Sequence, residues 1–179
     1  MGYGCFLVPK SQEKTDQENL TWRFSFSKSE VELAKLMPPV AKMCFMAIKA
    51  IRKDIFTKFP QEISSYCFKS IFLYTLEQTD PEKWLSKSEE NISECFIILL
   101  EKVIATFEDK KCPHFWIPRI DLFKDYTDKT LEKAIKALKE VKRRPNFYIE
   151  TFPKAFLERF PKMAKRTDRG ADYELAQLI

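Results

Sequence analysis

The chain has 179 residues, of which 45% are hydrophobic and 32% are charged, and its formal net charge is +5. This length suits one domain, or half of a larger protein, with ample apolar material for a core. Only three glycines are present, so the Gly-rich phosphate loops of Walker-type and Rossmann-type nucleotide sites are excluded. The mild positive charge does not by itself establish nucleic-acid binding.

The five cysteines are odd in number, far apart and never at the spacing CxxC. They predict reduced, mostly buried thiols in a cytoplasmic or nuclear protein. No segment is apolar for long enough to cross a bilayer, and no charged leader precedes an apolar run at the N-terminus. We therefore expect neither a membrane anchor nor export.

Two short strands are predicted at the start of the chain, at 5–8 and 21–27, with a polar loop between them. The second strand alternates along its length, with Arg23, Ser25 and Ser27 on one face and Trp22, Phe24 and Phe26 on the other. We expect the apolar face to be buried. The guanidinium and hydroxyls of the polar face suit phosphate or nucleotide oxygens, although an amphipathic edge strand with a solvated face explains the same pattern.

From residue 28 onward the apolar residues recur at helical spacing. Helices are predicted at 29–36, 40–58, 64–77, 88–107, 128–143 and 153–165. Ser64 is a candidate N-cap, and residues 115–118 form an aromatic connector that we expect to be buried. The chain is thus predicted to be mainly α, a multi-helix bundle with a short β remnant at its N-terminus.

A second set of candidate residues lies on two consecutive predicted helices. Lys49 is one position from the apolar stripe of the 40–58 helix, and Ser64-Ser65-Tyr66 opens the next helix. A helix N-terminus attracts anions through its N–H groups and dipole, and a tyrosine can stack on a base. An ordinary N-cap beside a half-buried tyrosine explains the same residues.

Other catalytic and metal sites find little support. His114 is the only histidine, and no nucleophile motif completes a triad around it. Cys112 and His114 supply two zinc ligands where a structural site needs four, so we interpret this segment as a turn. No acidic pair lies one residue apart on a predicted strand, as two-metal phosphoryl transfer requires, so no metal site is predicted.

Lysines and arginines are frequent in the 128–143 helix and again at 162–169. A basic stripe of this kind could meet a phosphate backbone. Glu132 and Glu140 interrupt it, so a solvated helix face is the alternative interpretation.

A set of segments along residues 4–123 carries a resemblance to a known family. The segments are Phe6-Leu7-Val8-Pro9-Lys10, Trp22-Arg23-Phe24-Ser25-Phe26-Ser27, Glu30, Lys49, Ser64-Ser65-Tyr66 with Lys69, Trp84, and Phe115-Trp116-Ile117-Pro118 with Leu122-Phe123. In order and spacing they resemble the C-terminal half of cyclic GMP–AMP synthase and its male-abnormal-21-like relatives. Residues 124–179 match poorly.

The resemblance implies a two-lobed parent fold, with a nucleotidyltransferase lobe followed by a helical lobe. It divides this chain into the terminal strands of an incomplete nucleotidyltransferase lobe at 1–27, a helical C-terminal lobe at 28–166 and a polar tail at 167–179.

The resemblance also implies roles for individual residues. Arg23, Ser25 and Ser27 would face a nucleotide with Glu30 nearby, Lys49 and Ser65 would hold triphosphate oxygens, Tyr66 would stack on the base, Lys10 would lie near the cleft, and Lys42 would face nucleic acid.

The chain also departs from the synthase. No zinc-binding insertion follows the 21–27 segment, and Met46 stands where a second basic residue would be, which resembles a zinc-free synthase-like receptor or a male-abnormal-21-like protein. The Gly-Ser loop and acidic metal ligands of the family would lie upstream of Met1. We therefore expect this chain to be inactive alone.

The function implied is that of a receptor's C-terminal lobe. It would contribute ATP and GTP binding, and sensing of double-stranded RNA or DNA, to cyclic dinucleotide synthesis in innate immune signalling. Mg²⁺ or Mn²⁺ is expected in the complete enzyme, with no cofactor in this chain. The alternative is a non-catalytic male-abnormal-21-like interaction module or a truncated pseudoenzyme.

Overall fold

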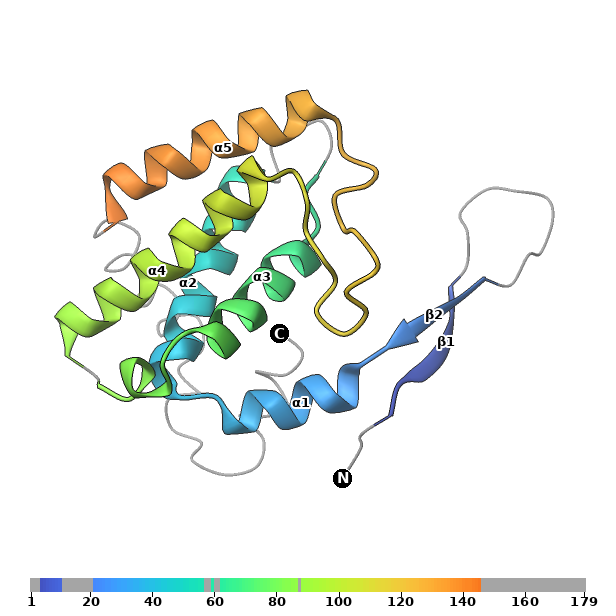
Figure 1. Cartoon of the computed structure of the whole chain (residues 1–179), viewed down its shortest axis with the longest axis horizontal. Coiled ribbons are helices and arrows are strands. Elements are labelled where there is room, and N and C mark those ends of the chain that lie inside the picture. The colour runs from blue at the N-terminus through green and yellow to red at the C-terminus, as the bar shows by residue number, and fades with distance from the viewer. Residues whose placement is uncertain (1–3, 11–20, 57–58, 60–61, 87, 146–179) are drawn as a thin grey trace. The chain divides into compact units, whose positions relative to one another are not determined.

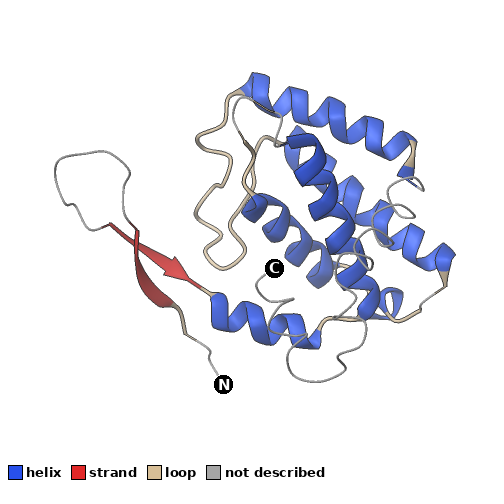
Figure 2. Cartoon of the chain, turned by 180° about the vertical axis from the view of Figure 1, so that it is seen from behind, coloured by secondary structure: helices blue, strands red, loops and turns tan. Residues whose placement is uncertain are grey.

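The computed structural model describes residues 4–10, 21–56, 59, 62–86 and 88–145. Its elements are β1 (Phe6–Lys10), β2 (Thr21–Ser25), α1 (Ser27–Leu36), α2 (Pro39–Phe56), α3 (Ser65–Gln78), the 3-10 helix η1 (Pro81–Trp84), α4 (Glu89–Glu108) and α5 (Asp128–Arg143). The predicted mainly α fold with a small N-terminal sheet is confirmed (Figures 1 and 2).

The chain divides into two compact units between Met37 and Pro38, here called the hairpin unit and the helical unit. The divisions predicted at 27/28 and 166/167 stay predictions, and the helix predicted at 153–165 lies outside the described residues. In the part of the chain that the structure describes, no helix has both the length and the apolar character needed to cross a membrane.

The hairpin unit contains the antiparallel pair β1–β2. Leu7 pairs with Phe24 and Pro9 with Trp22, and because opposed residues share a face, these four form one apolar surface. Trp22 is 59% exposed and Phe24 is 55% exposed, so the expected burial of this face is wrong. A two-stranded sheet by itself offers neither face a second layer, and alternation in the sequence cannot reveal that.

Strand β2 is shorter than predicted, because Ser27 begins α1 rather than ending the strand. The carbonyl of Phe26 already accepts a hydrogen bond from Glu30 N–H at 2.9 Å, which starts the helical ladder. Serine is common in both settings, so the polar–apolar alternation through Ser27 does not mark the change of structure.

In the helical unit, α4 is the central helix and packs against α2, α3 and α5 (Figure 1). Its neighbour α5 runs antiparallel beside it and buries an apolar stripe of Leu131, Ala134, Leu138 and Val141. This spacing follows the helical period, which explains why the predicted bounds of α5 agree with the structure.

Three helices of this unit begin at a hydroxyl N-cap. Ser64 Oγ accepts from Tyr66 N–H, Ser88 Oγ from Asn91 N–H, and Thr127 Oγ1 from Thr130 N–H, each at 3.2 Å. These bonds satisfy amides that the helical ladder leaves without a partner. The predicted N-cap at Ser64 is confirmed.

The core of the helical unit is aromatic. The Phe107 ring lies 4.7 Å from Phe123, 5.8 Å from Phe68 and 6.4 Å from Phe56 between centroids. Such pairs contribute about 0.5–1.5 kcal/mol each beyond the area they bury.

The cysteines follow the prediction of reduced and mostly buried thiols. All five are free, and Cys5 alone is exposed. Burial raises the pKa of the Cys44 thiol, and a hydrogen bond with Cys67 together with burial raises the pKa of Cys112. Thiols that stay protonated in this way are poor nucleophiles. They act instead as small apolar side chains that pack in the core.

The aromatic connector at 115–118 is half-buried rather than buried, and Pro118 is exposed. The segment folds back on itself, with Ile117 N–H donating to the carbonyl of His114 at 3.2 Å. Because a turn must leave some backbone groups to solvent, its side chains cannot all enter the core.

Candidate functional site

The predicted site residues of the hairpin unit lie on β1, on β2 and in the first turn of α1. Arg23 is exposed on β2, and the Oγ atoms of Ser25 and Ser27 lie 3.3 Å apart across the start of α1. Glu30 lies in the first turn of α1 and is 9% exposed. Lys10 is the last residue of β1, opposite Thr21. The predicted convergence of this group with residues of the helical unit stays a prediction.

In the helical unit, Lys49 of α2 is half-buried, and its Nζ lies 5.6 Å from the centroid of the Phe45 ring. Burial, followed by the positive charges of Lys69 and Arg52, lowers the pKa of Lys49 to about 8. Lys69 of α3 and Arg52 of α2 are therefore close enough to Lys49 to disfavour its charged form. We call Lys49, Arg52 and Lys69 the cationic cluster.

Arg52 fixes the start of α3 as well as adding charge. Its Nε donates to the carbonyl of Ile63 at 3.1 Å, and its guanidinium forms an ion pair with Glu62. Sequence reasoning gave Arg52 no role. Its spacing of three residues from Lys49 puts both on one face of α2, which is the signal that could have found it.

The start of α3 presents Ser65, while its neighbours are engaged. Tyr66 N–H is taken by Ser64 Oγ, and Ser64 N–H donates to the Tyr126 hydroxyl at 2.9 Å. Ser65 is exposed at the first helical position. An anion here would therefore meet the Ser65 hydroxyl, the helix dipole and the neighbouring lysines rather than the Tyr66 amide.

The Tyr66 ring is half-buried between a cation and a second ring. Lys69 Nζ lies 5.1 Å from its centroid, and the centroid of the His114 ring lies 4.8 Å away. His114 Nδ1 accepts from the N–H groups of Trp116 and Ile117, both at 3.1 Å, so the histidine is held within its turn. The contact between Tyr66 and His114 could not be predicted from a local pattern, because the two residues are far apart along the chain.

The interpretation of Cys112–His114 as a turn is wrong, because Pro113 forms an isolated antiparallel bridge with Asp121. Beside this bridge, Leu122 N–H donates to the carbonyl of Cys112 at 2.7 Å and His114 N–H donates to the carbonyl of Ile120 at 2.8 Å. The Cys112 thiol donates inward to the carbonyl of Cys67 at 3.9 Å, and His114 faces Tyr66. Within the described ranges, no group of three or more His, Cys, Asp or Glu side chains is placed to hold a metal ion.

The basic residues of α5 divide into two kinds. Lys139 pairs with Glu108 at 2.6 Å and Lys142 with Glu101 at 2.7 Å, both across to α4. Lys133 and Lys136 are exposed. The ion pairs of Lys139 and Lys142 favour the alternative interpretation of a solvated helix face at these two positions.

Lys42, predicted to face nucleic acid, is half-buried in the first turns of α2.

The protein is thus a small helical domain in which lysine side chains and the Tyr66 ring lie near the start of α3. The Mab-21 protein HhH/H2TH-like domain matches residues 40–140, which is more than half of the chain. The chain therefore belongs to the Mab-21 family, and the resemblance noted in the sequence is confirmed at that level.

Individual relatives agree with this assignment. The chain is 29% identical over 121 residues to "Cyclic GMP-AMP synthase-like receptor 1" of Drosophila erecta, covering 68% of this chain and 26% of that protein. The Drosophila melanogaster protein of the same name is 26% identical over 124 residues, covering 68% of this chain and 31% of that protein. "Protein mab-21-like" of Drosophila pseudoobscura pseudoobscura is 27% identical over 129 residues, covering 71% of this chain and 33% of that protein.

The chain spans about a quarter to a third of the length of these curated relatives. Together with the matched domain, they support a C-terminal domain of the nucleotidyltransferase family.

Proposed function

We propose that this chain is the helical C-terminal lobe of a cyclic GMP–AMP synthase-like receptor and that the start of α3 holds a nucleoside triphosphate. The observation that carries the proposal is the cationic cluster beside Ser65 and Tyr66. Lysine ammonium groups and a hydroxyl at a helix N-terminus complement triphosphate oxygens. An aromatic ring adjoining them can stack on a base, which contributes about 1–3 kcal/mol.

The proposal extends to the rest of the complete protein. Arg23, Ser25, Ser27, Glu30 and Lys10 would face the same nucleotide, with ATP and GTP as substrates. Mg²⁺ or Mn²⁺ would be held by the catalytic lobe, and the protein would act in the cytoplasm or nucleus in innate immune signalling. The relatives named as cyclic GMP–AMP synthase-like receptors support this reading.

Calorimetric titration of the purified chain with ATP tests the stacking role. We expect weak binding, and about tenfold weaker binding in Tyr66→Ala because the ring is lost. Tyr66→Phe keeps the ring and is the matched control, which should bind as the parent chain does. Equal affinity in Tyr66→Ala would remove the stacking role.

The pH dependence of ATP binding tests Lys49. Because its pKa is about 8, Lys49 loses its charge as the pH rises through that value, and ATP affinity should fall across about pH 7 to 9. Lys49→Arg stays charged and should abolish this dependence. If the ATP affinity of the parent chain did not change between about pH 7 and 9, that result would contradict a phosphate contact by Lys49.

The same lowered pKa has a consequence for stability. The unfolded chain holds the Lys49 proton more tightly than the folded chain does, since the ordinary value is 10.5. The contribution of Lys49 to the free energy of unfolding should therefore rise with pH between about 8 and 10.5.

Double-stranded RNA or DNA is the proposed activating ligand class, through Lys42 and the exposed lysines of α5. Replacing Lys133 and Lys136 by alanine should weaken RNA binding and reduce its dependence on salt. Replacing Lys139 and Lys142 removes the same charge from side chains already paired with α4, and should have a smaller effect. Equal binding by all three chains would leave α5 as a solvated surface.

A second candidate is a non-catalytic interaction module, favoured by the exposed apolar face of Leu7, Trp22 and Phe24. Exposed apolar patches commonly mark protein–protein contacts. The ATP titrations discriminate the two, because a module of this kind would show no nucleotide binding that depends on Tyr66.

A further inference from the structure

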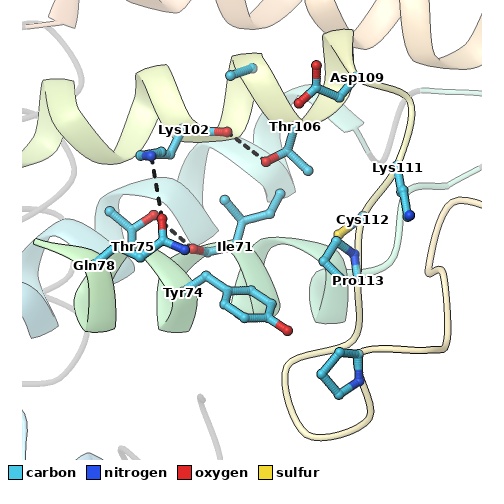
Figure 3. Close-up of a pocket in the computed structure, with 12 residues that line it drawn as sticks. Ile71, Tyr74, Thr75, Gln78, Lys102, Thr106, Asp109, Lys111, Cys112 and Pro113 are labelled. Carbon is cyan, nitrogen blue, oxygen red and sulfur yellow. Dashed lines mark hydrogen bonds between the residues drawn. The ribbon is translucent and has the colours of Figure 1, made fainter.

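A groove in the helical unit lies apart from the cationic cluster. It is bounded by α3, α4 and the 109–118 segment, and its volume is about 380 Å³. Figure 3 shows Lys102 and Gln78 at one end, Lys111 and Asp109 at the other, and Tyr74 between them. None of Lys49, Ser65 and Tyr66 lines it.

The floor of this groove behaves as an apolar surface, although it includes hydroxyl and thiol groups. Thr75 Oγ1 donates to the carbonyl of Ile71 at 2.8 Å, and the Cys112 thiol donates to the carbonyl of Cys67. Thr106 Oγ1 likewise donates to the carbonyl of Lys102 at 2.8 Å (Figure 3). With these groups satisfied inside the protein, the lining offers a ligand mainly carbon atoms, among them those of Ala105, Pro113 and Pro118.

The rim, in contrast, offers hydrogen-bond donors. Lys102 Nζ has only a long contact of 3.4 Å to Gln78 Oε1, and Lys111 is exposed. The Tyr74 hydroxyl donates to the carbonyl of His114 over 3.5 Å, which is also long. Among the described residues that line the groove, Asp109 is the one carboxylate against two lysines, so these side chains together carry a net positive charge.

From these observations we propose that the groove is a binding site for a small, flat, apolar molecule that carries one acidic group. The apolar floor would take the body of the molecule, and Lys102 or Lys111 would take the carboxylate or phosphate. The volume lies at the lower end of the range typical of ligand sites, about 300–1,000 Å³, and suits a single ring with its acidic substituent.

The test uses phenyl phosphate as the probe and the backbone amide spectrum of the ¹⁵N-labelled full chain as the readout. We expect saturable shifts centred on Tyr74, Gln78, Thr106 and Lys111. Phenol has the ring without the acidic group, and inorganic phosphate has the acidic group without the ring. Each should bind more weakly than phenyl phosphate. If either half binds as well as the whole probe, or if the shifts centre elsewhere, the proposal is overturned.

Two variants locate the binding. Replacing both Lys102 and Lys111 by alanine should weaken phenyl phosphate binding about tenfold, because charge-assisted hydrogen bonds are lost. The matched control, with Lys133 and Lys136 replaced, removes the same charge from α5 and should leave the affinity unchanged. Equal weakening in the control would overturn the proposal in favour of a general charge effect.

Ala105→Phe keeps both lysines and fills the groove, since Ala105 lines it and is exposed. It should also weaken binding about tenfold by steric exclusion, while the remaining amide shifts show an intact fold. Undiminished affinity in this variant would place the probe outside the groove and overturn the proposal.

Discussion

Two phenylalanines show how differently the two units of this chain use the same residue type. In the helical unit, Phe107 is fully buried among three other rings. In the hairpin unit, Phe24 is 55% exposed on the face it shares with Leu7 and Trp22. The difference lies in the number of layers, because helices that pack together bury a ring on several sides and a two-stranded sheet does not.

The two units also differ in how their helices begin. In the helical unit, α3, α4 and α5 each begin at a serine or threonine whose oxygen accepts a backbone N–H. In the hairpin unit, Phe26 holds the N-cap position of α1 and makes no such bond through its side chain. Three helices of the helical unit thus have a side-chain cap, whereas α1 begins without one and has only the acidic Glu30 in its first turn.

The largest expected effect tests the contrast between the two phenylalanines. Phe107→Ala should lower the free energy of unfolding by about 3–5 kcal/mol, because it leaves a cavity at the centre of the core. Phe24→Ala should change it by less than about 0.5 kcal/mol. Urea unfolding followed by helical circular dichroism measures both. Similar losses of unfolding free energy in the two variants would contradict the contrast between the buried and the exposed phenylalanine.

A smaller effect is expected at Asp121, which builds the turn region of the helical unit. Its Oδ1 accepts from the N–H groups of Cys112 and Phe123, both at 2.9 Å. Asp121→Ala should cost about 1–3 kcal/mol of unfolding free energy, because two amides lose their acceptor. Asp125→Ala, at an exposed position nearby, serves as the control and should cost much less. A neutral Asp121→Ala would mean that water replaces the carboxylate.

Ser64→Ala should cost about 1 kcal/mol by removing the N-cap of α3. Ser65→Ala is the matched control one residue later, and it should leave stability within about 0.5 kcal/mol. Thermal unfolding of both variants sharpens the contrast between capped and uncapped helices. An equal cost at the two positions would show that Ser64 does not act as a cap in solution.

The smallest effect concerns the ion pairs between α4 and α5. Lys139→Ala should cost about 0–1 kcal/mol, since the pair with Glu108 is exposed. That cost should vanish in about 1 M salt, where charges are screened over roughly 3 Å. Lys133→Ala, which removes an exposed lysine from the same helix, should cost nothing at either salt concentration. A cost that persists in high salt would indicate lost packing rather than lost charge.

Several elements were predictable because their signals are local. The bounds of α5 follow from the helical spacing of Leu131, Ile135 and Leu138, of which Leu131 and Leu138 are buried and Ile135 is half-buried. The start of α3 follows from Ser64, because a cap acts within one turn. Family membership was also readable from the order and spacing of short motifs, and the match of the Mab-21 domain to residues 40–140 confirms it.

The candidate site was only partly predictable. Lys49, Ser65 and Tyr66 were found from helix position and residue chemistry. Arg52 was missed, although its spacing from Lys49 places both on one face of α2. The contacts of Arg52 and His114 with the start of α3 join segments that are distant in the sequence, so no local pattern predicts those contacts. The grouping of Arg52 and Lys69 around Lys49 depends on how α2 packs against α3, which the sequence pattern does not show.

The amino-acid sequence alone determined where the helices of the helical unit begin and which faces they bury, because capping and helical periodicity act over a few residues. It also determined the family. Only the tertiary structure decided that the Trp22–Phe24 face stays exposed, that Lys49 shares its surroundings with Arg52 and Lys69, and that a groove opens between α3 and α4. Burial, charge coupling and cavities depend on which distant segments become neighbours, and that depends on the packing of the whole unit.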